Sequence, residues 1–341
     1  MKKQSTILLF ISLFIIAIII FLWDIITGSV HIPLSEILGI LFNNQDSDSA
    51  SSVILLQSRL PKALTAIIAG AALPVAGLMM QTYFRNPVAG PDILGVSAGA
   101  SLFVAIVMLS AGTIFSISAY NSYTIIIAAI LGSAIMLLII LAVAYKIKDS
   151  ITLLIFGLMF GMAISAVVGI LQYYSEKGAL KLFILWTFGS LGGVTWSQLY
   201  LLAPLVIIGV ITAVFFAKKL NLLLLGENYA RSLGLNLQQI KYVIIFLTAL
   251  LTGSITAFCG PIAFVGIAVP HLARMLFRTN DHYILIPASV LCGIIILLIC
   301  DMLTLVSGDS GILPLNSITA FMGAPFVIYI LWKNQHMKRL F

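Results

Sequence analysis

Residues 151–173 read ITLLIFGLMFGMAISAVVGILQY, a run that contains no Asp, Glu, Lys or Arg. An α-helix needs about 20 mostly apolar residues to cross the hydrocarbon layer of a bilayer. Inside that layer a backbone can satisfy its own N–H and C=O groups only as a helix or a closed barrel. This stretch therefore predicts a transmembrane helix.

The rest of the chain has the same character. Of its 341 residues, 61% are hydrophobic and 9% are charged, against roughly 45–50% and about 25% in soluble domains. So few charges cannot cover a water-facing surface of this size, which excludes a soluble globular enzyme and a disordered or fibrous chain. We expect an all-α polytopic membrane protein, with residues 1–341 forming a single transmembrane domain.

About ten transmembrane helices are predicted when the same length criterion is applied along the chain. The N-terminal apolar stretch from Ile7 to Trp23 exceeds the 7–15 residues of a signal-peptide core, so an uncleaved helix is expected. Segments that are short or interrupted by Gly and Pro often line a pathway, and 93–111 and 262–277 are of this kind. The predicted spans lie near 7–26, 60–83, 93–111, 123–145, 151–173, 199–217, 240–258, 262–277, 284–306 and 317–333.

The distribution of the charges that give the net charge of +7 indicates how the chain is oriented in the membrane. No basic stripe with interleaved aromatic residues is present, so nucleic-acid binding is not expected. With both termini cytoplasmic, the bases outside are Arg59, Lys62, Lys177 and Lys181, as the positive-inside rule requires. The bases inside are Lys2, Lys3, Arg85, Lys146, Lys148, Lys218, Lys219, Arg231, Lys241, Arg274, Arg278, Lys333, Lys338 and Arg339.

Motifs for chemistry within this chain are missing. The sequence has no G-x-x-x-x-G-K-[ST] and no H-E-x-x-H, which argues against a P-loop nucleotide site and a zincin-type metal site. His271 is interpreted as a structural residue. Asp301 is the clear ionisable residue within a span, and we expect it to hydrogen-bond a neighbouring helix, with a proton relay as the alternative.

Three glycine pairs have the small-xxx-small spacing that lets helix backbones approach closely. They are Gly95 with Gly99, Gly157 with Gly161, and Gly189 with Gly193. Packing within the chain is the simpler interpretation, against a dedicated dimer face.

Several motifs occur in order between Arg59 and Phe326, and together they resemble one family. The chain is similar to the permeases of ABC importers that take up iron–siderophore chelates, haem and cobalamin. The segments that carry the resemblance are RLPKAL (59–64), GAAL (70–73), QTYFRNPVAGPDILGVSAGA (81–100), LGENYARSLGL (225–235), GPIAFVGIAVPHLAR (260–274) and GAPF (323–326).

The resemblance implies the ten-helix type II importer permease fold, in a bacterial cytoplasmic membrane. Two permease subunits, identical or related, would surround a central path. Two cytoplasmic ATPase subunits, which hold Mg-ATP, and an external substrate-binding protein would complete the importer. This chain would then catalyse no reaction and hold no cofactor or metal. It would move an iron chelate, foremost an iron–siderophore complex, by alternating access; haem or cobalamin import and an ion-coupled secondary transporter are the alternatives.

The segment 218–239 is too polar to cross a membrane. Glu227 and Arg231 stand at i, i+4, a spacing that supports a short helix when the charges pair, and Gly226 and Gly234 bracket them. By resemblance this segment is the coupling helix that docks on the ATPase; a plain amphipathic surface loop is the alternative. The coupling residues are Gly226, Glu227, Asn228, Tyr229, Ala230, Arg231, Ser232, Leu233, Gly234 and Leu235.

The loop 85–92 carries Pro87 and Pro91, which fix φ and stop a helix, so it is predicted to be a rigid turn. The resemblance adds a cytoplasmic gate. Its residues would be Asn86, Val88, Ser150, Ile151 and Thr152; simple helix caps are the alternative.

Arg59 and Lys62 stand three residues apart at the predicted outer end of a span, hence on one helix face. The resemblance implies that they meet acidic groups of the binding protein, where opposite charges would steer docking. Contact with lipid headgroups is the alternative. Some relatives carry a further outer arginine where this chain has Leu305.

Overall fold

The computed structural model describes residues 3–28, 30, 32–43, 49–109, 121–147, 149–306, 311 and 313–333. All regular elements in these ranges are helical. Seven helices are long and apolar enough to cross a membrane. They are α1 (Lys3–Ile26), α4 (Leu60–Phe84, continuous with α3, Ala50–Val53, and the π-helical η1, Ile54–Arg59), α6 (Ser122–Lys146), α7 (Ser150–Tyr174), α9 (Trp196–Phe215), α12 (Leu237–Cys259) and α14 (His282–Thr304).

Three shorter apolar helices complete the predicted set. They are α5 (Val96–Leu109), α13 (Val265–Phe277) and α15 (Leu315–Lys333). The ten predicted spans therefore all correspond to helices, and the two expected to be atypical are the two shortest. The remaining elements are α2 (Leu34–Asn43), the 3₁₀ turn η2 (Pro91–Leu94), α8 (Lys177–Thr187), α10 (Ala217–Leu224) and α11 (Glu227–Ser232).

Helix α4 forms the centre of the bundle, where it packs against α14, α12, α13 and α9. Its close contacts depend on glycine. A Cβ at Gly70 would lie 2.6 Å from the carbonyl oxygen of Gly293 in α14, and a Cβ at Gly77 would overlap the backbone of Gly266 in α13. Small residues thus let three backbones meet, as in other membrane bundles.

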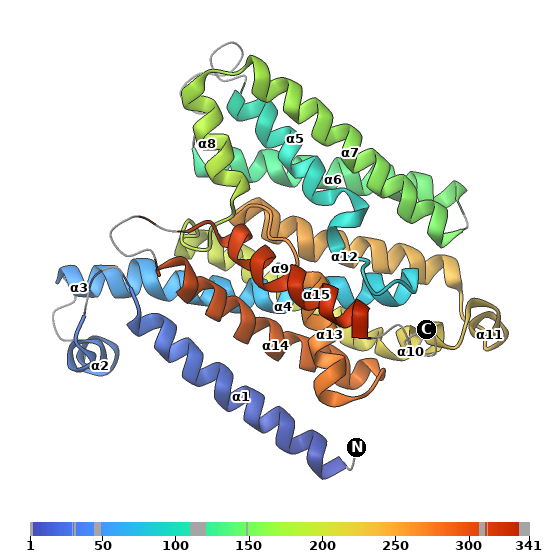
Figure 1. Ribbon diagram of the computed structural model, residues 1–341, viewed down its shortest axis with the longest axis horizontal. Coiled ribbons are helices and arrows are strands. Elements are labelled where there is room, and N and C mark those ends of the chain that lie inside the picture. The colour runs from blue at the N-terminus through green and yellow to red at the C-terminus, as the bar shows by residue number, and fades with distance from the viewer. Residues whose placement is uncertain are drawn as a thin grey trace.

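Helices α5, α6 and α7 form a second group, stacked beside α12 (Figure 1). A Cβ at Gly99 would lie 2.6 Å from the Gly132 oxygen, and one at Gly157 would lie 2.5 Å from the Ile93 oxygen. Two predicted glycine pairs therefore serve packing within the chain. The third pair lies in the loop between α8 and α9, where the φ of +70° of Gly189 cannot belong to a right-handed helix. It is therefore no helix–helix motif, but a Cβ at Gly189 would lie 2.9 Å from the Pro261 carbonyl oxygen, so Gly189 too serves packing within the chain.

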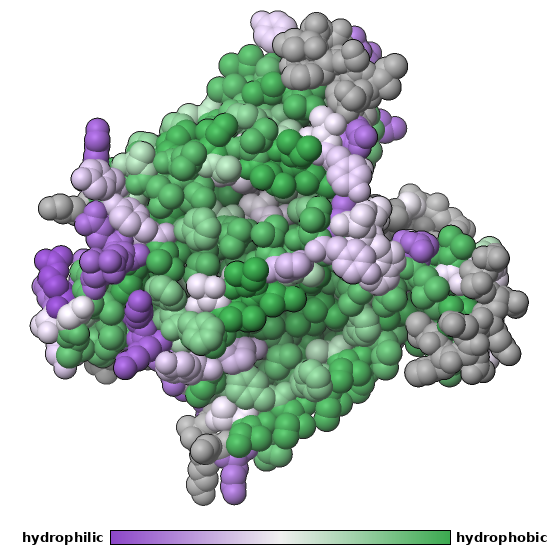
Figure 2. Space-filling view, turned by 180° about the vertical axis from the view of Figure 1, so that it is seen from behind, coloured by the Kyte–Doolittle hydropathy of each residue, from purple (hydrophilic) through white to green (hydrophobic). Residues whose placement is uncertain are grey.

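Large apolar side chains cover the outside of the bundle. Leu138, Ile170 and Phe215 are 65%, 59% and 78% exposed. Burying apolar area is worth roughly 25 cal/mol per Å², so such a surface suits lipid and not water. Figure 2 shows this apolar cover across the middle of one face, with hydrophilic side chains gathered mainly towards one end.

Candidate functional site: coupling segment, gate loop and outer polar cluster

The segment after α9 turns twice before α12 begins. Helix α10 is followed by the short helix α11, and Gly226 and Gly234 stand on either side of α11 with φ values of +113° and +82°. Such φ values favour glycine, which has no Cβ. The predicted short helix between these two glycines is therefore confirmed. Figure 1 places it at one extremity of the molecule, beside α10.

Three large apolar side chains of this segment are exposed. Leu225, which follows α10, Tyr229 of α11 and Leu233, which follows α11, are 59%, 55% and 53% exposed, whereas Ala230 of α11 is fully buried. We call these three exposed residues the coupling stripe. The predicted coupling residues began at Gly226 and left out Leu225, although an apolar side chain beside a polar segment was the available signal.

The predicted ion pair between Glu227 and Arg231 is not formed, so this part of the prediction was wrong. Both side chains instead line a cavity of about 250 Å³ together with Arg85 and Lys241. The i, i+4 rule describes an isolated helix. Here Arg85 and Lys241, which come from other helices, line the same cavity as Glu227 and compete with Arg231 for its carboxylate.

Arg85 joins the coupling segment to the predicted gate loop. It ends α4 in the left-handed conformation, with φ 47°, and its guanidinium donates to the Leu223 carbonyl near the end of α10 at 2.9 Å. The next residue, Asn86, opens the loop. A displacement of α10 and α11 therefore reaches the start of the loop through one charge-assisted hydrogen bond.

A buried polar chain forms a second link from α10. Asn221 Oδ1 accepts from the His282 backbone N–H at 2.8 Å and lies 2.7 Å from His282 Nδ1. His282 Nε2 lies 2.8 Å from the Thr82 hydroxyl in α4. Helix α10 is thus tied to α14 and α4 at the same end of the bundle.

The gate loop is a rigid turn, as predicted. Val88 N–H donates to Asn86 Oδ1 at 3.0 Å, and His271 of α13, which is 3% exposed, donates through Nε2 to the Pro87 carbonyl at 2.7 Å. The structural role predicted for His271 is confirmed. Just before the loop, Gln81 of α4 links α4 to α13, since its Nε2 donates to the Ile267 carbonyl at 3.1 Å.

The second predicted gate element is the first turn of α7. Asp149 caps it by accepting from the Thr152 backbone N–H at 2.7 Å and from the Thr152 hydroxyl at 2.6 Å. These bonds favour the carboxylate and lower the pKa of Asp149. Ile151 is 63% exposed, and η2 at the end of the gate loop packs on α7. This packing includes Gly157, where a Cβ would lie 2.5 Å from the Ile93 carbonyl oxygen. The gating role of the loop and of the first turn of α7 stays a prediction.

Arg59 lies inside the opposite end of the bundle. It is 7% exposed and donates to the carbonyls of Ile25 at 3.1 Å, Ile26 at 2.7 Å, and Val30. The guanidinium thus binds carbonyls at and just beyond the C-terminus of α1, where the helix dipole favours a cation.

Lys62 forms an ion pair of 2.9 Å with Asp301 in α14. The predicted bond between Asp301 and a neighbouring helix is confirmed. Asp24 at the end of α1, 5% exposed, lines the same polar cavity of about 430 Å³ as Arg59, Lys62 and Asp301. We call these four residues the outer polar cluster. Docking of a partner at Arg59 and Lys62 stays a prediction.

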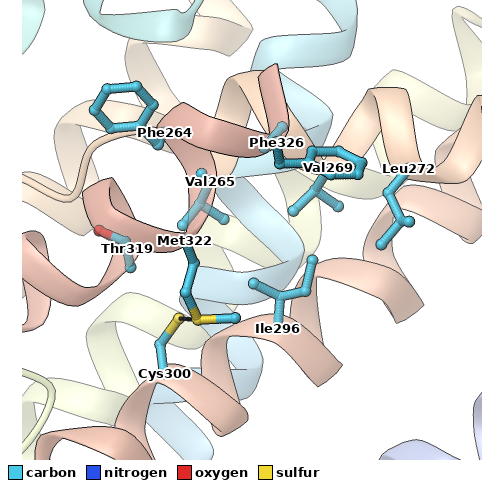
Figure 3. Close-up of a pocket in the computed structure, with 11 residues that line it drawn as sticks. Phe264, Val265, Val269, Leu272, Ile296, Cys300, Thr319, Met322 and Phe326 are labelled. Carbon is cyan, nitrogen blue, oxygen red and sulfur yellow. Dashed lines mark hydrogen bonds between the residues drawn. The ribbon is translucent and has the colours of Figure 1, made fainter. Parts of the chain in front are cut away.

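A small cavity of about 150 Å³ lies between α13, α14 and α15. Figure 3 shows its wall of Val265, Val269, Ile296 and other apolar side chains, with the Cys300 thiol 3.7 Å from the Met322 sulfur. Pockets for drug-sized ligands measure roughly 300–1,000 Å³. This cavity is too small to hold a metal chelate.

The sequence matches one known family over most of its length. The model of the FecCD transport family matches residues 15–333. The chain belongs to the FecCD transport family. Among FecCD relatives, the hemin transport system permease HmuU of Yersinia pestis is 34% identical over 296 residues, 86% of this chain and 88% of HmuU. The vitamin B12 import permease BtuC of Vibrio cholerae is 34% identical over 287 residues, 84% and 85% of the two chains.

A solved structure of the metal-chelate type of ABC transporter, in an inward-facing conformation, has the same fold. It superposes with a TM-score of 0.83 at 26% identity and covers 95% of this chain and 99% of that chain. This FecCD protein therefore has the type II ABC importer permease fold and is a multi-pass ABC importer permease. Its relatives are transport permeases and not enzymes.

Proposed function

We propose that this chain is the membrane subunit of an ATP-driven importer that carries an iron chelate into the cytoplasm. Two permease subunits would form the path, two ATPase subunits holding Mg-ATP would drive it, and an external binding protein would deliver the substrate. The chain would itself hold no cofactor or metal. The single observation that carries the proposal is the exposed coupling stripe, fixed to the gate loop through Arg85.

The end that carries α11 would face the cytoplasm, with both termini on that side of a bacterial cytoplasmic membrane. The bases Arg85, Lys146, Lys218 and Arg231 all stand at ends of helices on this side. Their position agrees with the positive-inside rule.

The coupling stripe supports docking of an ATPase. Leu225, Tyr229 and Leu233 expose three apolar side chains within one short segment at the end of the bundle, and exposed apolar side chains flanked by charges are typical of a protein interface. Buried Ala230 holds the segment against the bundle, so that force on the stripe moves α10 and not α11 alone. The residues from Gly226 to Leu235 would form this contact.

The docking experiment uses the full chain co-expressed with its candidate ATPase. Tyr229→Ala with Leu233→Ala should lower co-purification of the ATPase at least tenfold, because anchors at the centre of an interface carry most of its affinity. Phe215→Ala, which truncates another exposed apolar side chain, on α9, is the matched control. Unchanged co-purification of the double variant would contradict the docking proposal.

The gate would consist of Asn86 and Val88 in the loop and Ser150, Ile151 and Thr152 on α7. Docking motion would reach the loop through Arg85, while His271 keeps the loop fixed to α13 and Gln81 keeps the end of α4 fixed to α13. The loop and α13 would therefore move together. Two facing copies would close the path on its cytoplasmic side.

Arg59 and Lys62 would dock the binding protein at the other end. Both cations already have partners inside the chain, so an acidic group of the binding protein would have to compete with Asp301 and with backbone carbonyls. This competition predicts that docking rearranges the outer polar cluster. Charge steering would also make docking weaken as salt rises.

An iron–siderophore complex is the substrate that we propose, and haem and cobalamin are its direct competitors. The names of HmuU and BtuC refer to hemin and vitamin B12, and both ligands are metal complexes within large organic frames. Uptake of a radiolabelled ferric siderophore, hemin and cobalamin into cells that carry the full importer separates the three. Uptake that follows an ion gradient and ignores ATPase inhibition would instead favour a secondary transporter.

A further inference from the structure

The cavity beneath α11 concentrates positive charge at the end of the bundle. Arg85, Arg231 and Lys241 line it, with Glu227 as the acid of the lining. Asp149 lies within electrostatic range of Tyr83 in the same wall. The lining keeps a net positive charge when both acids are counted. The arrangement favours an anion.

Lys241 is a buried residue of the cavity wall and not a surface lysine. It is 6% exposed, and its ammonium donates to the carbonyls of Ala144 and of Ile147, the latter at 3.1 Å. An ammonium carries three N–H donors, so one remains for a ligand. Arg85 uses its bond to Leu223 and retains further donors of its five.

An apolar groove begins where this cavity ends. Leu141 and Tyr145 of α6 and Tyr242, Val243 and Phe246 of α12 line the groove, which has a volume of about 530 Å³. Tyr145 lines both the cavity and the groove. The groove runs from the cationic cavity along two helices whose outer surface is apolar, and Phe246 in it is 48% exposed.

We propose that the cavity and the groove together bind one anionic phospholipid. The phosphate would lie among Arg85, Arg231 and Lys241, because guanidinium and ammonium donors suit phosphate oxygens. One acyl chain would lie in the groove between α6 and α12. Basic pockets between transmembrane helices bind acidic headgroups in this way. The site goes beyond the proposed function, since it requires no ATPase and no substrate.

The proposed lipid site lies between the coupling segment and the start of the gate loop. The phosphate would contact Arg85, whose bond to Leu223 links α10 to the gate loop, and Arg231 of the coupling helix. An anionic lipid would therefore stabilise the arrangement in which the coupling segment is held against α4. A zwitterionic lipid adds no net negative charge and would leave the net positive charge of the cavity in place.

The test measures binding of lipid to the purified full chain by native mass spectrometry. Phosphatidylglycerol and phosphatidylcholine with the same acyl chains are titrated in parallel. The chain should retain phosphatidylglycerol, and Arg231→Gln should weaken its binding about fivefold, the loss expected for one basic contact. Lys218→Gln removes a charge at the same end but outside the cavity and should change nothing. Lys241→Gln should weaken the binding of phosphatidylglycerol further, because Lys241 is buried in the cavity wall. If the Lys241→Gln variant does not fold, Arg231→Gln still provides the test.

The groove separates a lipid from a free phosphate. Phe246→Ala should weaken phosphatidylglycerol binding, whereas Phe215→Ala, on another lipid-facing surface, should not. Equal retention of both lipids, or equal effects of Arg231→Gln and Lys218→Gln, would overturn the proposal. Full competition by inorganic phosphate with no effect of Phe246→Ala would reduce the site to a phosphate site and would overturn it as well.

Discussion

The two ends of the molecule use their charged residues in opposite ways. In the outer polar cluster Arg59 and Lys62 are turned inward, where they bind helix-end carbonyls and Asp301. In the coupling segment Glu227 and Arg231 form no ion pair with each other, and the coupling stripe of Leu225, Tyr229 and Leu233 is exposed. The cations of one end are held by contacts within the chain, whereas the apolar side chains of the other end are exposed.

This difference indicates where a partner would have to displace contacts within the chain and where it would not. At the outer end an incoming acidic group would have to replace existing contacts, so binding and rearrangement would be coupled. At the coupling end the proposed contact surface is already exposed in the single chain. We therefore expect substitutions at the outer end to affect stability first, and substitutions at the coupling end to affect transport first.

The largest effect is expected for Lys62→Met. It leaves the buried Asp301 carboxylate without its cation, and breaking one side of a buried pair costs about 3–5 kcal/mol. Thermal unfolding of the purified chain measures this loss. The double variant Lys62→Met with Asp301→Leu should recover most of the stability; no recovery would show that the pair itself is not the cause.

A smaller loss of stability is expected for Arg59→Gln. Hydrogen bonds to a charged group contribute about 1.5–3 kcal/mol, and the glutamine amide cannot reach all three carbonyls that the guanidinium binds. Thermal unfolding measures the difference. Lys177→Gln, which removes an exposed cation near the same end, is the control, and equal losses in both variants would contradict a special role of Arg59.

Arg85→Gln should act mainly on transport and lower stability by no more than the contribution of one hydrogen bond. Loss of the bond to Leu223, worth about 1.4 kcal/mol, corresponds to an approximately tenfold lower rate of coupled uptake. ATPase co-purification should remain normal because the coupling stripe is intact. Lys146→Gln is the control, and a loss of co-purification in Arg85→Gln would place Arg85 in docking and not in transmission.

Asp149→Asn should give the smallest effect, confined to the first turn of α7. Because hydrogen bonds from Thr152 lower the pKa of Asp149, its cap is fully present above the unfolded value of about 3.9. The contribution is lost as pH falls through the lowered pKa of the folded state. Amide exchange at Thr152, corrected for its intrinsic pH dependence, should rise on acidification in the parent chain, whereas the amide cap of the variant does not titrate. Identical pH profiles would contradict this assignment.

The ten spanning segments and their helical type followed from runs of apolar residues, whereas the short helices α2, α8 and α10 were not predicted. Ten apolar segments had no alternative to being helices, since a bilayer offers backbone groups no other partner. The short helix between Gly226 and Gly234 and the rigid turn at Pro87 also followed from local backbone preferences. Local rules failed at Glu227 and Arg231, because the charges that surround them come from α4 and α12, outside their own helix.

The sequence by itself thus determined the class of protein, its helices and its turns, because these depend on runs of residues and on single backbone angles. The tertiary structure alone decided which charges are internal and which are available. Arg59 and Lys62 became internal because α1 and α14 present carbonyls and Asp301 to them, and the cationic cavity arose because Arg85, Arg231 and Lys241 converge from separate segments. Such convergence depends on packing, which no local pattern contains.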